Sequence, residues 1–211
     1  MEQMHNHMHC RFCSISEGNT FNGAADIPID ASSDYFSIAS IGAIIEGWTL
    51  VVPRRHCLSL RGLYGSEEFS RFVDHLVAKV EAIYGAVTIF EHGANHNSSP
   101  TSCGTDHAHL HVVPIGFSLR ALVETSNLAP WHLINASEIN GCTNGAEYLF
   151  FSEHPQNKDP KGYLHVLEQP RSQFFRALIA NAIGKPHLSD YKIHSLLDTA
   201  ERTNKRLSTV G

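Results

Sequence analysis

The sequence predicts an α+β fold, an antiparallel β-sheet with helices packed mainly on one side. Strand-like segments rich in branched and aromatic residues are joined by short turns. Helical segments stand between or after them, without the regular strand–helix alternation that a parallel sheet requires. The 211 residues, 42% of them hydrophobic, suffice for one compact core.

The chain up to the histidine row predicts four strands and a long helix. Residues 35–53 predict two strands joined by a turn, because Ile, Val and aromatic residues are interrupted by glycines. Apolar residues recur at helical spacing over residues 66–85, with Ser66 expected as the N-cap and Gly85 as the stop. A strand is expected over residues 86–93, followed by a polar loop that leads to a second strand, with which it forms a hairpin-like pair.

That second strand, "HAHLHVV", carries His107, His109 and His111 at every second position. Successive side chains of a strand point to opposite faces, so the three histidines are expected to share one face and the apolar residues between them the other. The apolar face would pack in the core. The histidine face would line a site.

The second half predicts two further strands and two helices. The strands are expected over residues 147–153 and 162–169, on either side of a polar turn. An amphipathic helix is expected over residues 172–184, and a last helix from about Ser189 to Arg206.

Composition excludes several classes of protein. A net charge of -5 gives no basic footprint for nucleic acid, so we expect a small ligand. No apolar run approaches the roughly 20 residues of a membrane span, and the N-terminus lacks the features of a signal peptide, which favours a cytoplasmic protein. Five cysteines, an odd number, favour metal binding or free thiols over a disulfide framework.

Histidines in such a row suit nucleophilic chemistry at phosphorus. A backbone carbonyl that takes the hydrogen of one ring nitrogen leaves the other lone pair free to attack. Attack on a phosphate gives a covalent phosphoramidate and divides one difficult displacement into two easier ones. The neighbouring histidines and loop donors would stabilise the phosphate oxygens.

The row matches the signature His-φ-His-φ-His-φ-φ, where φ is apolar, and the chain therefore resembles the histidine triad (HIT) family of nucleotide hydrolases and nucleotidyltransferases. "CRFC", "GWTLVVPRRHCLSL" and "FEHG" are similar to further family landmarks and occur in the right order, over roughly residues 10–118. The resemblance implies a HIT-like catalytic domain at residues 1–120. Residues 121–211 would be a C-terminal strand and helix extension packed on the same core, and we expect a homodimer.

The resemblance implies His109 as the nucleophile, with His107 and His111 completing the catalytic triad and His111 assisting the leaving group. Relatives that transfer uridylyl groups carry Gln at the position of His111, so that branch is disfavoured. Glu91 stands where many members have Asn, and the "GQ" that usually precedes the triad is missing.

Cys10 and Cys13 form a Cys-x-x-Cys pair, which alone fits either metal binding or redox chemistry. A thioredoxin-like role lacks its βαβ context, and a tetrahedral zinc site needs two more ligands. The resemblance implies His56 and His107 as those ligands, around a structural zinc ion (Zn2+). Ordinary thiols in a loose N-terminus are the alternative, and His5, His7 and His9 could compete for the ion.

The substrate would be a nucleotide, held by residues near the triad. Loop hydroxyls, a carboxylate and the start of the helix at 172–184 supply polar groups, and Arg171, Arg176 and His92 could also reach the site. An ordinary loop and solvated helix residues are the alternatives. The predicted substrate-binding residues are Ser99, Ser102, Thr105, Glu91 and Gln173.

These observations favour a nucleotide hydrolase that acts through a nucleotidyl-histidine intermediate on dinucleoside polyphosphates or related conjugates. A phosphorylase or nucleotidyltransferase with an acceptor other than water is the closest alternative. A non-catalytic nucleotide-binding module and a pure metal-binding protein are the others.

Overall fold

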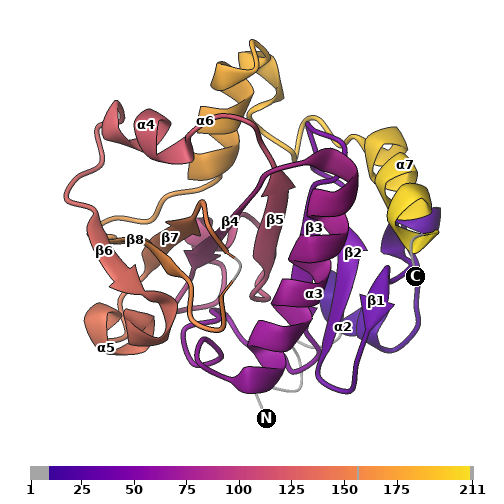
Figure 1. Ribbon diagram of the computed structural model, residues 1–211, viewed down its shortest axis with the longest axis horizontal. Helices are drawn as coiled ribbons and strands as arrows, with labels where there is room; N and C mark the ends of the chain where they lie inside the picture. Colours follow the sequence, from indigo (N-terminus) through magenta and orange to yellow (C-terminus); the bar gives the residue numbers. More distant parts are fainter. Residues whose placement is uncertain (1–9, 156, 210–211) are drawn as a thin grey trace.

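The computed structural model, which describes residues 10–155 and 157–209, contains one eight-stranded sheet with helices around it (Figure 1). All the strand pairs are antiparallel, in the order β1-β2-β3-β5-β4-β7-β8-β6. The strands are β1 Asp30–Ala31, β2 Tyr35–Ala39, β3 Thr49–Pro53, β4 Val87–Gly93, β5 Leu110–Pro114, β6 His132–Asn135, β7 Tyr148–Ser152 and β8 Lys161–Val166.

The α-helices vary from one turn to five. They are α2 Arg11–Ser16, α3 Glu67–Tyr84, α4 Leu119–Glu124, α5 Ile139–Thr143, α6 Phe174–Ala182 and α7 Leu197–Ser208. The longest, α3, begins where predicted, because the Ser66 side chain accepts a hydrogen bond from the backbone N–H of Phe69. It ends at Gly85, whose φ of +86° suits a residue without a Cβ.

The structure confirms the α+β class, the strand pair within residues 35–53 and the pairing of β4 with β5.

The prediction of helices mainly on one side of the sheet is wrong. One hydrophobic cluster packs α3, α5 and α7 against one face of the sheet, and a second packs α2, α4 and α6 against the other. Neighbouring strand residues alternate between the two clusters, as Ile89 and Phe90 do, so β2, β3 and β7 are buried on both faces.

The last helix begins at Leu197 instead of near Ser189. The segment before it forms a turn, because the Asp190 carboxylate accepts hydrogen bonds from the Gln173 side chain and from the backbone N–H of Lys192. This turn brings Tyr191 against the residues that line the cavity described below. Short elements such as α2, β1 and β6 were not predicted.

Residues 121–211 continue the same sheet. β7 pairs with β4 along five residues, from Ile89 opposite Ser152 to Gly93 opposite Tyr148. β8 and β6 then extend the sheet beyond β7, and α6 and α7 each join one of the two clusters.

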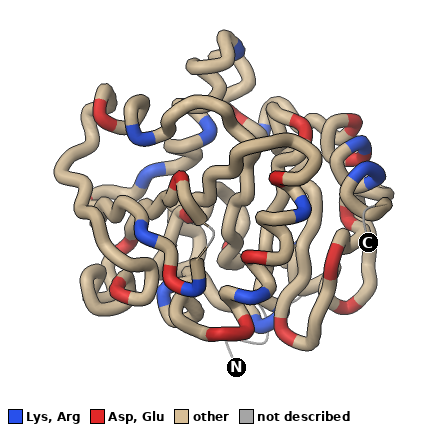
Figure 2. Tube along the Cα trace, viewed as in Figure 1, with Lys and Arg blue, Asp and Glu red and all other residues tan. Residues whose placement is uncertain are grey.

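Charged residues of both signs are interspersed along the trace (Figure 2). Among the helices of the described residues, none combines the length and apolar character that crossing a membrane would take. His5, His7 and His9 lie outside the described residues.

Candidate active site and metal site

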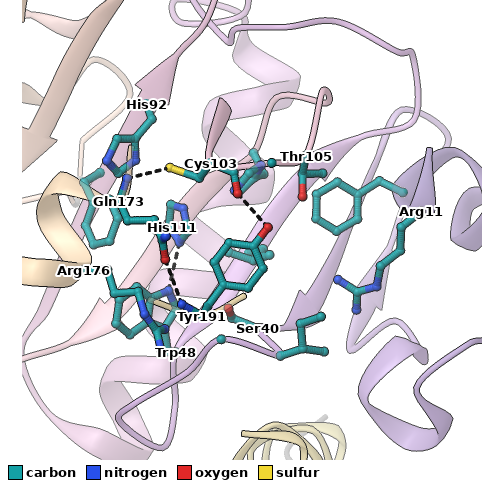
Figure 3. A pocket seen from close by; sticks show the side chains of 17 residues that line it. Arg11, Ser40, Trp48, His92, Cys103, Thr105, His111, Gln173, Arg176 and Tyr191 are labelled. Atoms are coloured by element: carbon teal, nitrogen blue, oxygen red, sulfur yellow. Dashed lines mark hydrogen bonds between the residues drawn. The ribbon is translucent and has the colours of Figure 1, made fainter. Parts of the chain in front are cut away.

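A cavity of about 260 Å³ opens on the α6 side of the sheet. Its walls come from segments far apart in the sequence: α2, the turn after β2, strands β3, β4 and β5, the loop before β5, α6 and the turn before α7. Figure 3 shows the side chains that surround it, with His111 near the middle and Arg11 and Arg176 on opposite sides. His109 and His111 line the cavity, whereas Leu110 and Val112 are fully buried in the core on the other face.

His109 is held in a defined orientation by the backbone. Its Nδ1 lies 2.9 Å from the carbonyl oxygen of His107. A carbonyl only accepts, so Nδ1 carries the hydrogen in the neutral ring and Nε2 keeps a lone pair. Burial lowers the pKa of His109 more than the bond to His107 raises it, which favours the neutral form.

His111 is held in the opposite tautomer. The indole Nε1–H of Trp48 donates to His111 Nδ1 at 2.9 Å, so Nε2 carries the hydrogen in the neutral ring. The ring stacks on Phe90, its cross-strand partner, with centroids 4.5 Å apart. Burial, and then the neighbouring His109, hold the pKa of His111 well below its ordinary value. The row therefore offers a lone pair on His109 and an N–H on His111.

His107 belongs to a second cluster, at the end of the cavity where α2 begins. Ligand atoms of Cys10, Cys13, His56 and His107 all lie within 4.8 Å of one another. Cys10 Sγ is 3.2 Å from His107 Nδ1, and Cys13 Sγ is 3.3 Å from His56 Nδ1. Cys10 is the N-cap of α2, so one turn of helix places both thiols on the same side. The four residues form a possible metal-binding site.

The surroundings of this cluster suit a cation. Burial, and then the nearby Cys10, raise the pKa of Cys13 to about 12, and a bound cation would offset that cost. His107 Nε2 donates to the carbonyl of Pro53 at 2.7 Å, which turns its Nδ1 toward the thiols. Two thiols and two imidazoles in this arrangement are a donor set that zinc prefers.

The two sites are linked by the backbone of His107. Its side chain faces the Cys/His cluster, and its carbonyl oxygen accepts the hydrogen bond from His109. Whatever fixes the position of His107 therefore also fixes the ring of His109.

The predicted substrate-binding residues separate into two groups. Thr105 and Gln173 line the cavity. Ser99 and Ser102 are buried within their loop and do not line it: Ser99 accepts from the Thr101 N–H, and Ser102 donates to the Ser99 carbonyl and to Asp106. These two hydroxyls shape the loop.

Glu91 also lies away from the cavity. It is fully buried on the opposite face of β4, where Oε1 accepts from the Leu60 N–H at 2.7 Å. Oε2 accepts from the hydroxyls of Tyr64 and Tyr148 at 2.9 and 2.7 Å. Burial raises the pKa of Glu91, and these hydrogen bonds oppose the rise. The prediction of Glu91 as a substrate contact is not supported by this position, because strand alternation turns the side chain into the core.

Several lining residues were not predicted. Arg11 stands between Cys10 and Cys13 in the sequence and forms an ion pair with the buried Asp26. Trp48, one residue before β3, orients His111. Tyr191 donates its hydroxyl to the Cys103 carbonyl at 2.6 Å and its N–H to the Gln173 side chain at 2.9 Å (Figure 3). Of these three residues, only Trp48 could have been predicted from the sequence. It stands two residues before Leu50, so strand alternation turns both side chains to the same face.

Comparison with protein-family models and with curated proteins found no match for this chain.

Proposed function

We propose that the protein is a HIT-type nucleotide hydrolase in which His109 attacks the α-phosphorus of a nucleotide conjugate. The observation that carries the proposal is the bond from His109 Nδ1 to the His107 carbonyl, which leaves the Nε2 lone pair available beside the cavity. The complementary tautomer of His111 supports it, because the His111 Nε2–H can donate to a phosphate or leaving-group oxygen.

The reaction would proceed in two displacements. In the first, a bond forms between His109 Nε2 and phosphorus as the bond from phosphorus to the leaving oxygen breaks, and the leaving group takes that electron pair. In the second, water attacks phosphorus, the P–N bond breaks, and Nε2 recovers its lone pair as the water loses a proton. The products are a nucleoside monophosphate and the other half of the conjugate.

The cavity provides both polar and apolar contacts for such a substrate. Thr105 offers a hydroxyl beside the triad, and Ile41, Leu50 and Phe12 offer apolar surface for a nucleoside. Depressed pKa values of His109 and His111 keep both rings neutral near pH 7, the state that a nucleophile and a neutral donor need.

For the Cys/His cluster we propose a structural zinc ion. Cys10, Cys13, His56 and His107 would supply four ligands, which leaves no open position for a substrate. Its contribution would be to anchor α2 and His107, and through the His107 carbonyl the ring of His109.

The test is product analysis by chromatography. Wild type, His109→Ala and the control His96→Ala, whose side chain is exposed, are incubated with diadenosine tetraphosphate, with and without inorganic phosphate. We expect AMP and ATP from wild type and the control, and almost none from His109→Ala. Equal turnover by His109→Ala would contradict the proposal, and a nucleoside diphosphate formed only with added phosphate would identify a phosphorylase.

The predicted homodimer is tested on the same preparation by sedimentation velocity. A mass of one chain, 23.4 kDa, at micromolar concentration would contradict it.

A further inference from the structure

The cavity wall contains buried polar atoms that have no partner. Among the described residues, five buried side-chain nitrogen or oxygen atoms make no hydrogen bond, and three of them belong to two residues that line the cavity. These atoms are Nδ1 and Nε2 of His92 and Nη2 of Arg176. Because buried polar groups are nearly always paired in native proteins, their concentration here points to a ligand.

Arg176 is the stronger of the two signals. Its side chain comes from the first turn of α6 and the residue is only 5% exposed. Nε donates to the carbonyl of Leu188 at 3.0 Å, and no ion pair to Arg176 exists within the described part of the chain. Burial lowers the pKa of Arg176 to about 10, only partly offset by Asp190. A buried guanidinium with one hydrogen bond is costly, and an anion would remove that cost.

The other arginine in the wall makes a clear contrast. Arg11 already pairs with the buried carboxylate of Asp26 through Nε and Nη2. Its charge is therefore satisfied within the fold, and Arg176 is the lining arginine left to bind an anion.

His92 adds a neutral donor close to the triad. Its ring centroid is 6.2 Å from that of His111 and 5.2 Å from that of Phe175, the neighbour of Arg176 on α6. Figure 3 shows His92, Gln173 and Arg176 on the same side of the cavity, away from Arg11. One N–H from the imidazole and the free N–H groups of the guanidinium suit phosphate oxygens.

We infer that His92 and Arg176 form an anion subsite beside His111 that holds a phosphate of the leaving half of the substrate. This inference rests on the proposed function, in which His111 serves the leaving oxygen. It narrows the substrate class: the group that departs is itself a phosphate or polyphosphate, as in dinucleoside polyphosphates. Conjugates that release an uncharged amine, such as nucleoside phosphoramidates, would leave Arg176 unpaired and would be poorer substrates.

Binding of inorganic phosphate tests the subsite without any turnover. Wild type, Arg176→Met, His92→Phe and Arg120→Met are titrated with phosphate by calorimetry at constant ionic strength, after thermal unfolding shows that each is folded. Arg120 is the control because its side chain is exposed and pairs with Glu124. We expect Arg176→Met to weaken phosphate binding on the order of 10- to 100-fold and His92→Phe by several-fold, with Arg120→Met unchanged.

A comparison of two substrates tests the leaving-half assignment. In Arg176→Met, kcat/KM for diadenosine tetraphosphate should fall on the order of 10- to 100-fold, whereas kcat/KM for adenosine 5′-phosphoramidate should change less than about 3-fold. An equal fall for both substrates would overturn the assignment to the leaving half.

The binding and turnover results separate the two proposals. Phosphate binding that is absent in wild type, or unchanged in both Arg176→Met and His92→Phe, refutes the subsite even if nucleotides are hydrolysed. Failure to turn over either substrate refutes the proposed function, and loss of phosphate binding in Arg176→Met would then still establish the anion subsite.

Discussion

Glu91 and His92 are neighbours on β4, and they show how differently the two faces of one strand treat buried polar groups. On one face, Glu91 accepts three hydrogen bonds from Leu60, Tyr64 and Tyr148. On the other, both ring nitrogens of His92 are buried and make no hydrogen bond to the described residues.

The difference separates polar groups that belong to the fold from groups available to a ligand. A satisfied network fixes a unique packing arrangement, so its loss should be felt in stability. An unsatisfied group costs stability in the free protein, so it is retained where a ligand completes it. Substitutions on the two faces should therefore affect different properties.

The largest effect is expected on the cavity face. His109→Ala should lower turnover of diadenosine tetraphosphate on the order of 10³-fold or more, because it removes the covalent route. The free energy of unfolding, measured in urea, should change far less. A fall in stability that accounts for the whole loss of activity would break the distinction between the faces.

Among the groups on the cavity face, the Cys/His cluster should contribute most to the free energy of unfolding. Cys13→Ala should abolish most zinc binding and lower the free energy of unfolding by about 3–4 kcal/mol when free zinc exceeds its Kd by 100- to 1,000-fold. Elemental analysis and urea unfolding measure the two effects. Cys142→Ala is the matched control, because that thiol is exposed; a wild type that is stable and zinc-free would contradict the metal site.

On the core face, Glu91→Ala should act on stability and spare the chemistry. It leaves the Leu60 N–H and two tyrosine hydroxyls unpaired, which should lower the free energy of unfolding by about 3 kcal/mol. The kcat of the folded fraction should stay close to that of wild type. Glu124→Ala, an exposed carboxylate, should change stability by less than about 0.5 kcal/mol.

The smallest effect is a change in pH dependence. Burial lowers the pKa of His92 to about 3, from an ordinary value of 6.5. Below pH 6.5 the unfolded state takes up a proton at this residue that the folded state does not, so stability falls as the pH drops from about 6.5 toward 3.

His92→Phe removes the imidazole that takes up this proton in the unfolded state, and keeps a ring of similar shape. Its unfolding should take up about half a proton fewer than that of wild type at pH 6.5, and about one proton fewer at pH 5. Urea unfolding at several pH values gives the number, and equal slopes for both proteins would show that His92 is protonated in the folded state.

The sequence predicted the elements whose signals are local. Helix α3 has a capping serine, a regular apolar stripe and a terminal glycine, and its bounds are found within one residue. The alternation over residues 107–112 likewise predicted that Leu110 and Val112 turn to the core and His109 and His111 to the cavity. His107 faces the Cys/His cluster instead. The side of the sheet that each helix covers depends on contacts between distant segments, and that prediction was wrong.

The candidate site shows the same division. Cys10, Cys13, His56 and His107, which the family resemblance implied as one ligand set, do lie together. The Cys-x-x-Cys spacing by itself pointed only to the two cysteines. Glu91 was predicted to contact the substrate because of its place in the motif "FEHG". It is the neighbour of His92 on the strand, so its side chain points to the opposite face. Arg11 and Tyr191 reach the cavity only through tertiary packing, so no pattern in the chain could have pointed to them.

The pairing of β4 with β7 bears on whether the C-terminal ninety or so residues are a removable module. A protein cut after residue 120 would lose β7, β8 and β6, and β4 would become an edge with five unpaired backbone positions. Such edges recruit other strands and promote aggregation. The same cut would also remove α6 and Tyr191 from the cavity wall. A minimal catalytic fragment made from the first 120 residues would therefore be prone to aggregate. The protein should not be divided at residue 120, although the sequence motifs suggest a boundary there.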